Sequence, residues 1–97
     1  MKKFSYKWTE DYYLLHFQLD RQFEGETRLK LVRLFRGGES KTEEVKVPSH
    51  DKSYRFLLSR THPREIEFNF EYLPEMTLSV FQLEDRAYYP TEAFFVG

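Results

Sequence analysis

The sequence predicts an all-β protein, an antiparallel β-sandwich of the jelly-roll or immunoglobulin-like type with seven to eight strands. Apolar and polar residues alternate without a break from position 65 to 72, and a strand with one buried face produces this pattern. Further segments of this kind follow one another at intervals of about ten residues, with turn residues between them. No segment keeps the period of an α-helix over a useful length.

The length and composition predict one domain that spans residues 1–97. A chain of this length buries about 60 to 65% of the surface that its unfolded form exposes, which is enough for one core. Aromatic residues make up 19% of the chain, with ten Phe and seven Tyr, and large rings bury much area per residue. The chain has no cysteine, so its stability must come from packing and not from disulfides.

The charge balance argues against electrostatic partners. Fifteen basic residues face sixteen acidic ones, so no overall positive field attracts nucleic acid or an anionic membrane. Charged residues interrupt the N-terminal segment before an apolar stretch of signal-peptide length forms, and no apolar run is long enough to span a bilayer. We therefore expect a cytoplasmic protein without a membrane span.

Seven segments carry the alternation of strands. In residues 4–8 the aromatic residues share one face, and in residues 11–20 the core face holds Tyr13, Leu15, Phe17 and Leu19. The weakly apolar segment 41–47, which ends at Pro48, suits the edge of a sheet. We expect strands over residues 4–8, 11–20, 26–36, 41–47, 53–59, 65–73 and 76–83.

The segment 26–36 has apolar residues on both faces. Leu29 and Leu31 fall on one side, whereas Val32 and Leu34 fall on the other. Either both faces are covered there, or a bulge reverses the facing of the strand. The Gly37-Gly38 pair that follows predicts a tight hairpin turn, because glycine adopts the positive φ angles that such turns need.

The segments 53–59 and 65–73 are predicted to form a hairpin around the linker 60–64. With Ser59 opposite Glu65, every inward pair is apolar, and each pair contributes roughly 0.2 to 1 kcal/mol beyond Ala–Ala. This register places Leu58 opposite Ile66, Phe56 opposite Phe68, and Tyr54 opposite Phe70.

The polar residues show no pattern of catalysis or metal binding. His16, His50 and His62 have no metal-site spacing, and we interpret them as structural. Three glutamates share one face of the segment 65–72, which we interpret as the solvent face of that strand. No nucleophile elbow or phosphate-binding glycine loop is present. The three glutamates are Glu65, Glu67 and Glu71. From the absence of these patterns we expect a non-enzyme without cofactor or metal.

Two groups of residues are candidate binding surfaces. The aromatic group exceeds what one small core easily absorbs, so we predict a contact surface for protein or sugar, the alternative being that these rings close the ends of the core. The basic group would suit single-stranded nucleic acid if exposed rings lay beside it, the alternative being pairing with Glu43, Glu44, Glu67 and Glu71. The aromatic group is Trp8, Tyr12, Tyr88, Tyr89, Phe94 and Phe95, and the basic group is Arg28, Lys30, Arg33 and Arg36.

Part of the chain resembles a known family. The segments 54–58 and 66–70, together with 29–35 and the Gly37-Gly38 turn, look like the β-sandwich half of the third accessory Sec secretion protein. That family supports the export of glycosylated serine-rich adhesins in Gram-positive bacteria, and its fold resembles carbohydrate-binding modules. The resemblance implies an all-β fold and a role in bacterial accessory secretion, and it assigns no functional residue.

These observations together predict a non-catalytic binding or adaptor module. Its expected partner is another protein or a second copy of the chain. A carbohydrate-binding module and a small single-stranded nucleic-acid-binding protein stay open as alternatives. Sugar binding requires two or three coplanar rings exposed on one sheet face, whereas nucleic-acid binding requires the basic group to be unpaired and next to an exposed ring.

Overall fold

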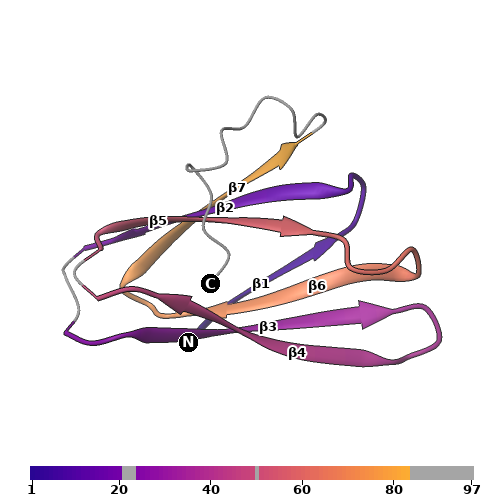
Figure 1. Ribbon diagram of the computed structural model, residues 1–97, viewed down its shortest axis with the longest axis horizontal. Coiled ribbons are helices and arrows are strands. Elements are labelled where there is room, and N and C mark those ends of the chain that lie inside the picture. Colours follow the sequence, from indigo (N-terminus) through magenta and orange to yellow (C-terminus); the bar gives the residue numbers. More distant parts are fainter. Residues whose placement is uncertain (21–23, 50, 84–97) are drawn as a thin grey trace.

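The protein is an all-β structure of antiparallel strands in two sheets (Figure 1). A computed structural model describes residues 1–20, 24–49 and 51–83. The seven expected strands are confirmed over these ranges. They are β1 (Lys2–Lys7), β2 (Tyr12–Leu19), β3 (Thr27–Phe35), β4 (Ser40–Val47), β5 (Ser53–Ser59), β6 (Glu65–Tyr72) and β7 (Met76–Leu83).

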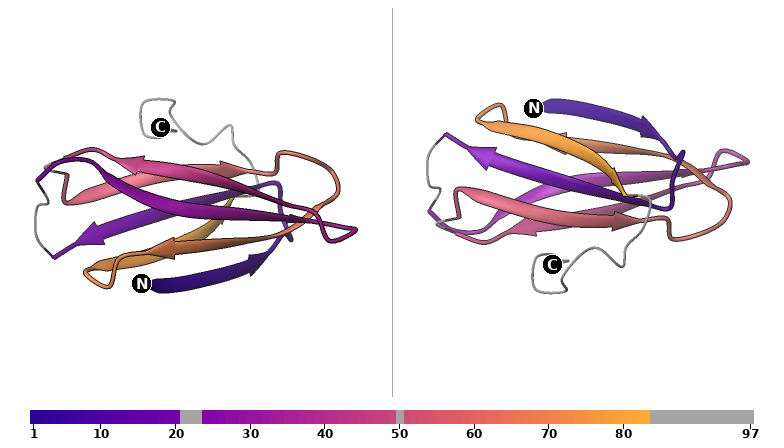
Figure 2. Two further views of the ribbon diagram at one scale, coloured as in Figure 1. Left: turned by 90° about the horizontal axis from the view of Figure 1, so that it is seen from below. Right: turned by 90° about the horizontal axis from the view of Figure 1, so that it is seen from above.

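The strands divide unequally between the two layers, which Figure 2 shows from two sides. The four-stranded sheet has the order β1-β6-β3-β4, and the three-stranded sheet has the order β5-β2-β7. Among the described strands, only β3 and β4 are both consecutive in the chain and paired. The other connections therefore cross from one sheet to the other. No helix that could cross a bilayer occurs among the described residues.

The core lies between the sheets and consists mainly of large rings and leucines. Phe68 from β6 packs on Trp8 and Tyr13, with ring centroids 5.0 and 5.6 Å apart, and Phe17 stacks on Phe70 at 5.1 Å. The expected core face of β2 is confirmed, because its four residues are all buried. The buried cluster is Trp8, Tyr13, Leu15, Phe17, Leu19, Leu29, Leu31, Val45, Val47, Tyr54, Phe56, Leu58, Phe68, Phe70 and Met76.

The predicted hairpin between β5 and β6 is wrong. β5 pairs with β2 in one sheet, with Phe56 opposite Leu15, whereas β6 pairs with β1 and β3 in the other, with Phe68 opposite Tyr6 and Arg33. The alternation in both segments correctly indicated one buried face each. It did not specify the neighbouring strand, and a five-residue linker can cross between sheets as well as turn within one.

A bulge at the start of β6 corrects two further expectations. Leu34 pairs with Glu67 and Phe35 with Glu65, so Ile66 is an extra residue in β6. Ile66 is consequently 42% exposed and does not face the core as expected, and Glu65 is 1% exposed and does not face solvent as expected. From Phe68 onward the predicted facing is confirmed.

β3 keeps its alternation as far as Arg33. Leu29, Leu31 and Arg33 are buried between the sheets, and Val32 and Leu34 are half-buried on the outer face. The bulge that was one of the two explanations for residues 26–36 therefore lies in the neighbouring strand β6 and not in β3. The turn after β3 has Gly37 and Gly38 at φ values of 104° and 88°, as expected for the hairpin to β4.

Candidate functional site

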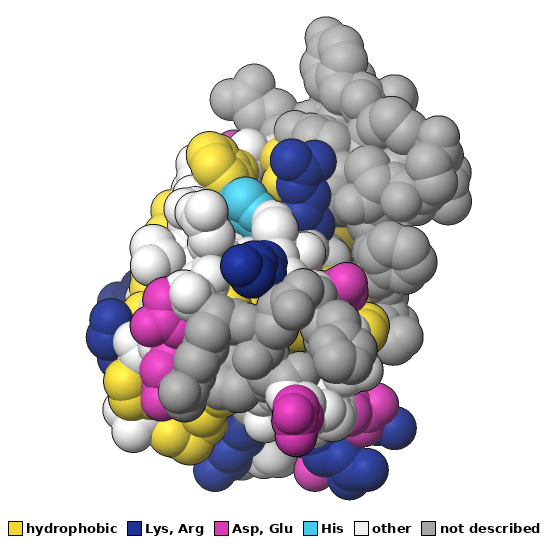
Figure 3. All heavy atoms as spheres, turned by 90° about the vertical axis from the view of Figure 1, so that its left-hand side faces the viewer, with side chains coloured by type: hydrophobic (Ala, Val, Ile, Leu, Met, Phe, Trp, Pro, Cys, Tyr) yellow, Lys and Arg dark blue, Asp and Glu magenta, His cyan; other side chains and the backbone are white. Residues whose placement is uncertain are grey.

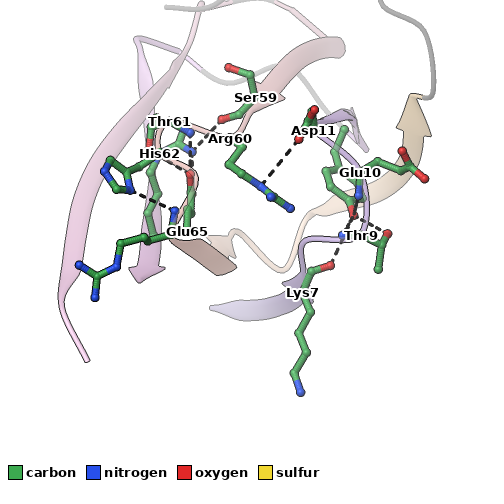
Figure 4. A network of polar contacts seen from close by, with 12 residues as sticks. Lys7, Thr9, Glu10, Asp11, Ser59, Arg60, Thr61, His62 and Glu65 are labelled. Atoms are coloured by element: carbon green, nitrogen blue, oxygen red, sulfur yellow. Dashed lines mark hydrogen bonds and ion pairs between the residues drawn. The ribbon is translucent and has the colours of Figure 1, made fainter. Parts of the chain in front are cut away.

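Residues 60–64, here called the crossover loop, carry the chain from β5 in the three-stranded sheet to β6 in the four-stranded sheet. Figure 4 shows the polar groups around this loop. The carboxylate of Glu65 accepts hydrogen bonds from the Thr61 backbone N–H at 2.6 Å and the Thr61 hydroxyl at 2.9 Å. The first side chain of β6 therefore fixes Thr61, the second residue of the loop.

Arg33 neutralises the buried carboxylate. Its Nη1 lies 2.8 Å from Glu65 Oε1 and also donates to the carbonyl oxygen of Ser59 at 2.9 Å. Its Nε lies 3.4 Å from a carboxylate oxygen of Glu43. Arg33 on β3 thus binds both ends of the crossover loop, and each buried charge has an opposite charge beside it. We interpret this cluster as structural.

A second set of contacts fixes the turn between β1 and β2. The hydroxyl of Tyr13 accepts a hydrogen bond from the Thr9 backbone N–H at 2.8 Å and donates to the Lys7 carbonyl at 3.4 Å. The guanidinium of Arg60 lies over the ring of Trp8, 5.6 Å from its centroid. The crossover loop is therefore anchored to the connection between β1 and β2 as well as to β3.

A groove of about 370 Å³ opens between the crossover loop and the β3–β4 turn, and we call it the turn groove. The Arg36 N–H donates to the Arg64 carbonyl at 2.8 Å, and Arg64 Nη2 donates to the Arg36 carbonyl at 2.9 Å. The two loops are thus joined along one wall. The groove is lined by Phe35, Arg36, Glu39, Lys41, Thr61, His62 and Arg64.

The outer face of the three-stranded sheet is apolar at its middle. Leu14 on β2 lies opposite Leu57 on β5 and Phe81 on β7, so the three side chains form a row across the sheet. Phe81 is 50% exposed, and the other two are half-buried. A groove of about 410 Å³ includes two members of this row and is lined by Leu14, His16, Arg55, Phe81, Gln82 and Leu83.

The predicted aromatic surface does not form around Trp8. Trp8 is 8% exposed and belongs to the core, because it follows β1 on the same face as Phe4 and Tyr6. Tyr12 is half-buried beside the crossover loop, in a depression that Arg60 and His62 also line. Tyr88, Tyr89, Phe94 and Phe95 lie outside the described residues. Among the described Phe, Tyr and Trp residues, Phe81 is the one that is exposed, at 50%, so those residues present no platform of coplanar exposed rings for sugar.

The predicted basic group is divided by the structure. Arg28 and Lys30 lie on the outer face of the four-stranded sheet, Arg36 lines the turn groove, and Arg33 is buried at 4% exposure. The expectation that Arg33 belongs to a surface patch needs correction, because the alternation of β3 turns it inward. Arg28 pairs with Glu26 at 3.3 Å and with Glu44 at 3.5 Å.

Charged side chains of both signs are interspersed on the face that Figure 3 shows. This distribution agrees with the nearly balanced charge of the chain. His16 lies in β2 and His62 in the crossover loop, and His50 lies outside the described residues. In the described part of the chain, no group of three or more His, Asp or Glu side chains is placed to bind a metal ion.

Sequence reasoning missed two features of these sites. Burial of Glu65 had no local signal, because it depends on Arg33, which lies on a neighbouring strand but far away along the chain. The row formed by Leu14, Leu57 and Phe81 had one: each breaks the alternation of its strand by placing an apolar residue on the outer face. Reading these three departures together would have indicated an apolar outer surface.

No protein-family model, no curated protein and no solved structure matches the chain.

Proposed function

We propose that this protein is a non-catalytic binding module that takes an extended segment of a partner protein along the edge of β7. Such a segment would add a fourth strand to the three-stranded sheet and place alternate side chains on the outer apolar row. The observation that carries the proposal is the contrast between β7 and the other edge strands.

In the part of the chain that the structure describes, each sheet has two edge strands, and charged residues on an edge oppose pairing with other chains. Three of the four edge strands carry such charges: three lysines in β1, two lysines and two glutamates in β4, and one arginine in β5. β7 carries none over its eight residues, and β2 is its sole partner among the described strands. Its sequence also favours strand pairing, since it contains Thr, Val and Phe and lacks proline.

The apolar row supports a polypeptide partner over a sugar. A strand paired with β7 would place every second side chain on the outer face, beside Phe81 and the groove that Leu14 also lines. Backbone hydrogen bonds would supply the affinity, and this groove would select the side chains. Arg55 and His16 at the groove wall offer polar contacts at its rim.

A peptide-display selection tests the proposal. A library of about eight random residues, the length of one strand, is expected to yield peptides with alternating apolar residues. Replacing Thr77 and Ser79 by Lys should weaken the selected peptides at least about tenfold, because each added charge must be desolvated at the new pair. The matched control carries Ser40→Lys and Thr42→Lys on β4, whose residues are exposed, and should bind normally.

If the β4 control loses as much affinity as the β7 variant, the peptide does not bind along the edge of β7. A selection that enriches no peptide would also contradict the proposal. Sedimentation velocity tests whether a second copy of the chain, and not another protein, occupies the β7 edge. If the native chain forms a dimer and the Thr77→Lys, Ser79→Lys variant does not, the partner at this edge is a second copy.

For the type of sandwich, we propose the immunoglobulin-like arrangement over the jelly roll. Support comes from the pairing of β2 with β5 and of β3 with β6 in opposite sheets, since the immunoglobulin sandwich pairs its second strand with its fifth and its third with its sixth. A role in accessory Sec export stays a prediction from the family resemblance.

A further inference from the structure

The turn groove carries an excess of positive charge. Arg36 and Arg64 form no ion pair with any described residue, and Lys41 is paired with Glu43 at 3.2 Å. Glu39 is the one carboxylate among the residues that line the groove. Two guanidinium groups are therefore available to a ligand there, and this arrangement favours an anion.

The guanidinium of Arg64 is fixed in position before any ligand binds. Its Nη2 donates to the Arg36 carbonyl at 2.9 Å. A Cβ atom on Gly37 would lie 3.3 Å from the same Nη2, so the absence of a side chain at Gly37 lets the guanidinium lie against the turn. A side chain that is already ordered loses less entropy on binding than a free one, and its other N–H groups stay available as donors.

His62 offers a further donor. Its Nδ1 lies 3.0 Å from the Arg64 backbone nitrogen, which can donate a hydrogen bond but cannot accept one. Nδ1 must therefore be the acceptor, and the neutral ring carries its proton on Nε2. The ring of Phe35 stands edge to face with His62 at 6.0 Å and gives the groove an apolar wall.

We propose that the turn groove binds the phosphate group of a small phosphate monoester. A phosphate has several acceptor oxygens, which match the fork-shaped donors of two arginines and the imidazole N–H. The volume of about 370 Å³ exceeds that of a phosphate alone, so the organic part of the ester would lie against Phe35. This site is separate from the β7 edge and does not depend on the function proposed there.

An NMR titration of the full chain, labelled with nitrogen-15, tests the site with three probes: phenyl phosphate, inorganic phosphate and benzoate. Phenyl phosphate is expected to bind with a dissociation constant on the order of 1 mM and to shift the amide signals of residues 36–41 and 61–64. Inorganic phosphate and benzoate should bind about tenfold more weakly, since each lacks one half of the recognised chemistry.

Two variants and one control locate the binding. Arg36→Gln and Arg64→Gln should each weaken phenyl phosphate about tenfold. Arg28→Gln removes an arginine whose side chain is 61% exposed on the outer sheet face, and it should leave the affinity unchanged. Thermal melting checks that each variant folds. If Arg64→Gln does not fold, Arg36→Gln decides, because no described residue contacts the Arg36 side chain through an ion pair.

Three results would overturn the proposal. The first is a lack of saturation at about 10 mM phenyl phosphate, well above the expected dissociation constant. The second is equal weakening by Arg28→Gln, which would indicate binding to surface charge in general. The third is equal affinity for inorganic phosphate or benzoate, which would reject the monoester as ligand.

Discussion

The outer faces of the two sheets are built in opposite ways. Across the four-stranded sheet, the row Lys3, Glu71, Lys30 and Glu44 alternates in charge from one edge to the other. Across the three-stranded sheet, the corresponding row is Leu57, Leu14 and Phe81. Opposite charges on neighbouring strands attract one another within the sheet, and charged side chains oppose pairing with other chains. An exposed apolar row beside an uncharged edge strand lacks this protection and is poorly solvated. The difference supports the proposal that a partner protein docks on the three-stranded sheet.

The largest expected effect tests whether both sheets bury their inner faces equally. Phe68→Ala in the four-stranded sheet and Phe17→Ala in the three-stranded sheet should each lower the free energy of unfolding by about 3 to 5 kcal/mol, because both rings are fully buried. Urea titration measures this. Glu67→Ala on the outer face is the control and should change stability by no more than about 0.5 kcal/mol. Equal losses for Phe68 and Glu67 would refute the facing of β6.

The next effect concerns Glu65, whose buried carboxylate pairs with Arg33 and accepts a hydrogen bond from Thr61 of the crossover loop. Glu65→Gln should lower the free energy of unfolding by about 3 kcal/mol, because it leaves the charge of Arg33 buried without its closest partner. Glu67→Gln, two residues further along the same strand, should stay within about 0.5 kcal/mol. Guanidinium denaturation of the two variants compares them directly. Equal stability would show that Glu65 is solvated and that the bulge at Ile66 is misplaced.

A smaller effect separates the two faces of the three-stranded sheet. Phe81→Ala should change the free energy of unfolding by less than about 1 kcal/mol, because half of the ring is exposed. In the same protein, Phe17→Ala provides the large reference value. A loss at Phe81 as large as that at Phe17 would mean that the outer row belongs to a second core, and the contrast between the two outer faces would disappear.

The smallest expected effect concerns the charged outer face of the four-stranded sheet, which should not bind single-stranded DNA. Arg28 is paired with two glutamates, and Lys30 lies opposite both Glu71 and Glu44. The chain should therefore show no salt-sensitive retention on single-stranded DNA at physiological ionic strength. One phosphate site of millimolar affinity does not retain it either. Retention that falls steeply with added salt would show that the face binds anions despite its pairing.

The sequence predicted all seven strands that the structure describes and little of their arrangement. Alternation in residues 11–20 correctly gave the buried face of β2, and the Gly37-Gly38 pair correctly gave the β3–β4 hairpin. Both features are local, because a strand's two faces and a turn's φ angles depend on neighbouring residues alone. Of the predicted aromatic site, the structure retains Tyr12 as a partly accessible ring and places Trp8 in the core.

The amino-acid sequence by itself determined that this chain forms an all-β structure with aromatic rings in its core. The buried face of each strand, the conformation of a turn and the apolar content all depend on residues that are close together in the chain. Only the tertiary structure decided that β5 and β6 belong to different sheets and that Arg33 meets Glu65 between them. The physical reason is that strand pairing and charge burial depend on residues far apart in the chain. Alternation specifies which side of a strand is apolar, and the packing of the whole molecule selects its neighbours.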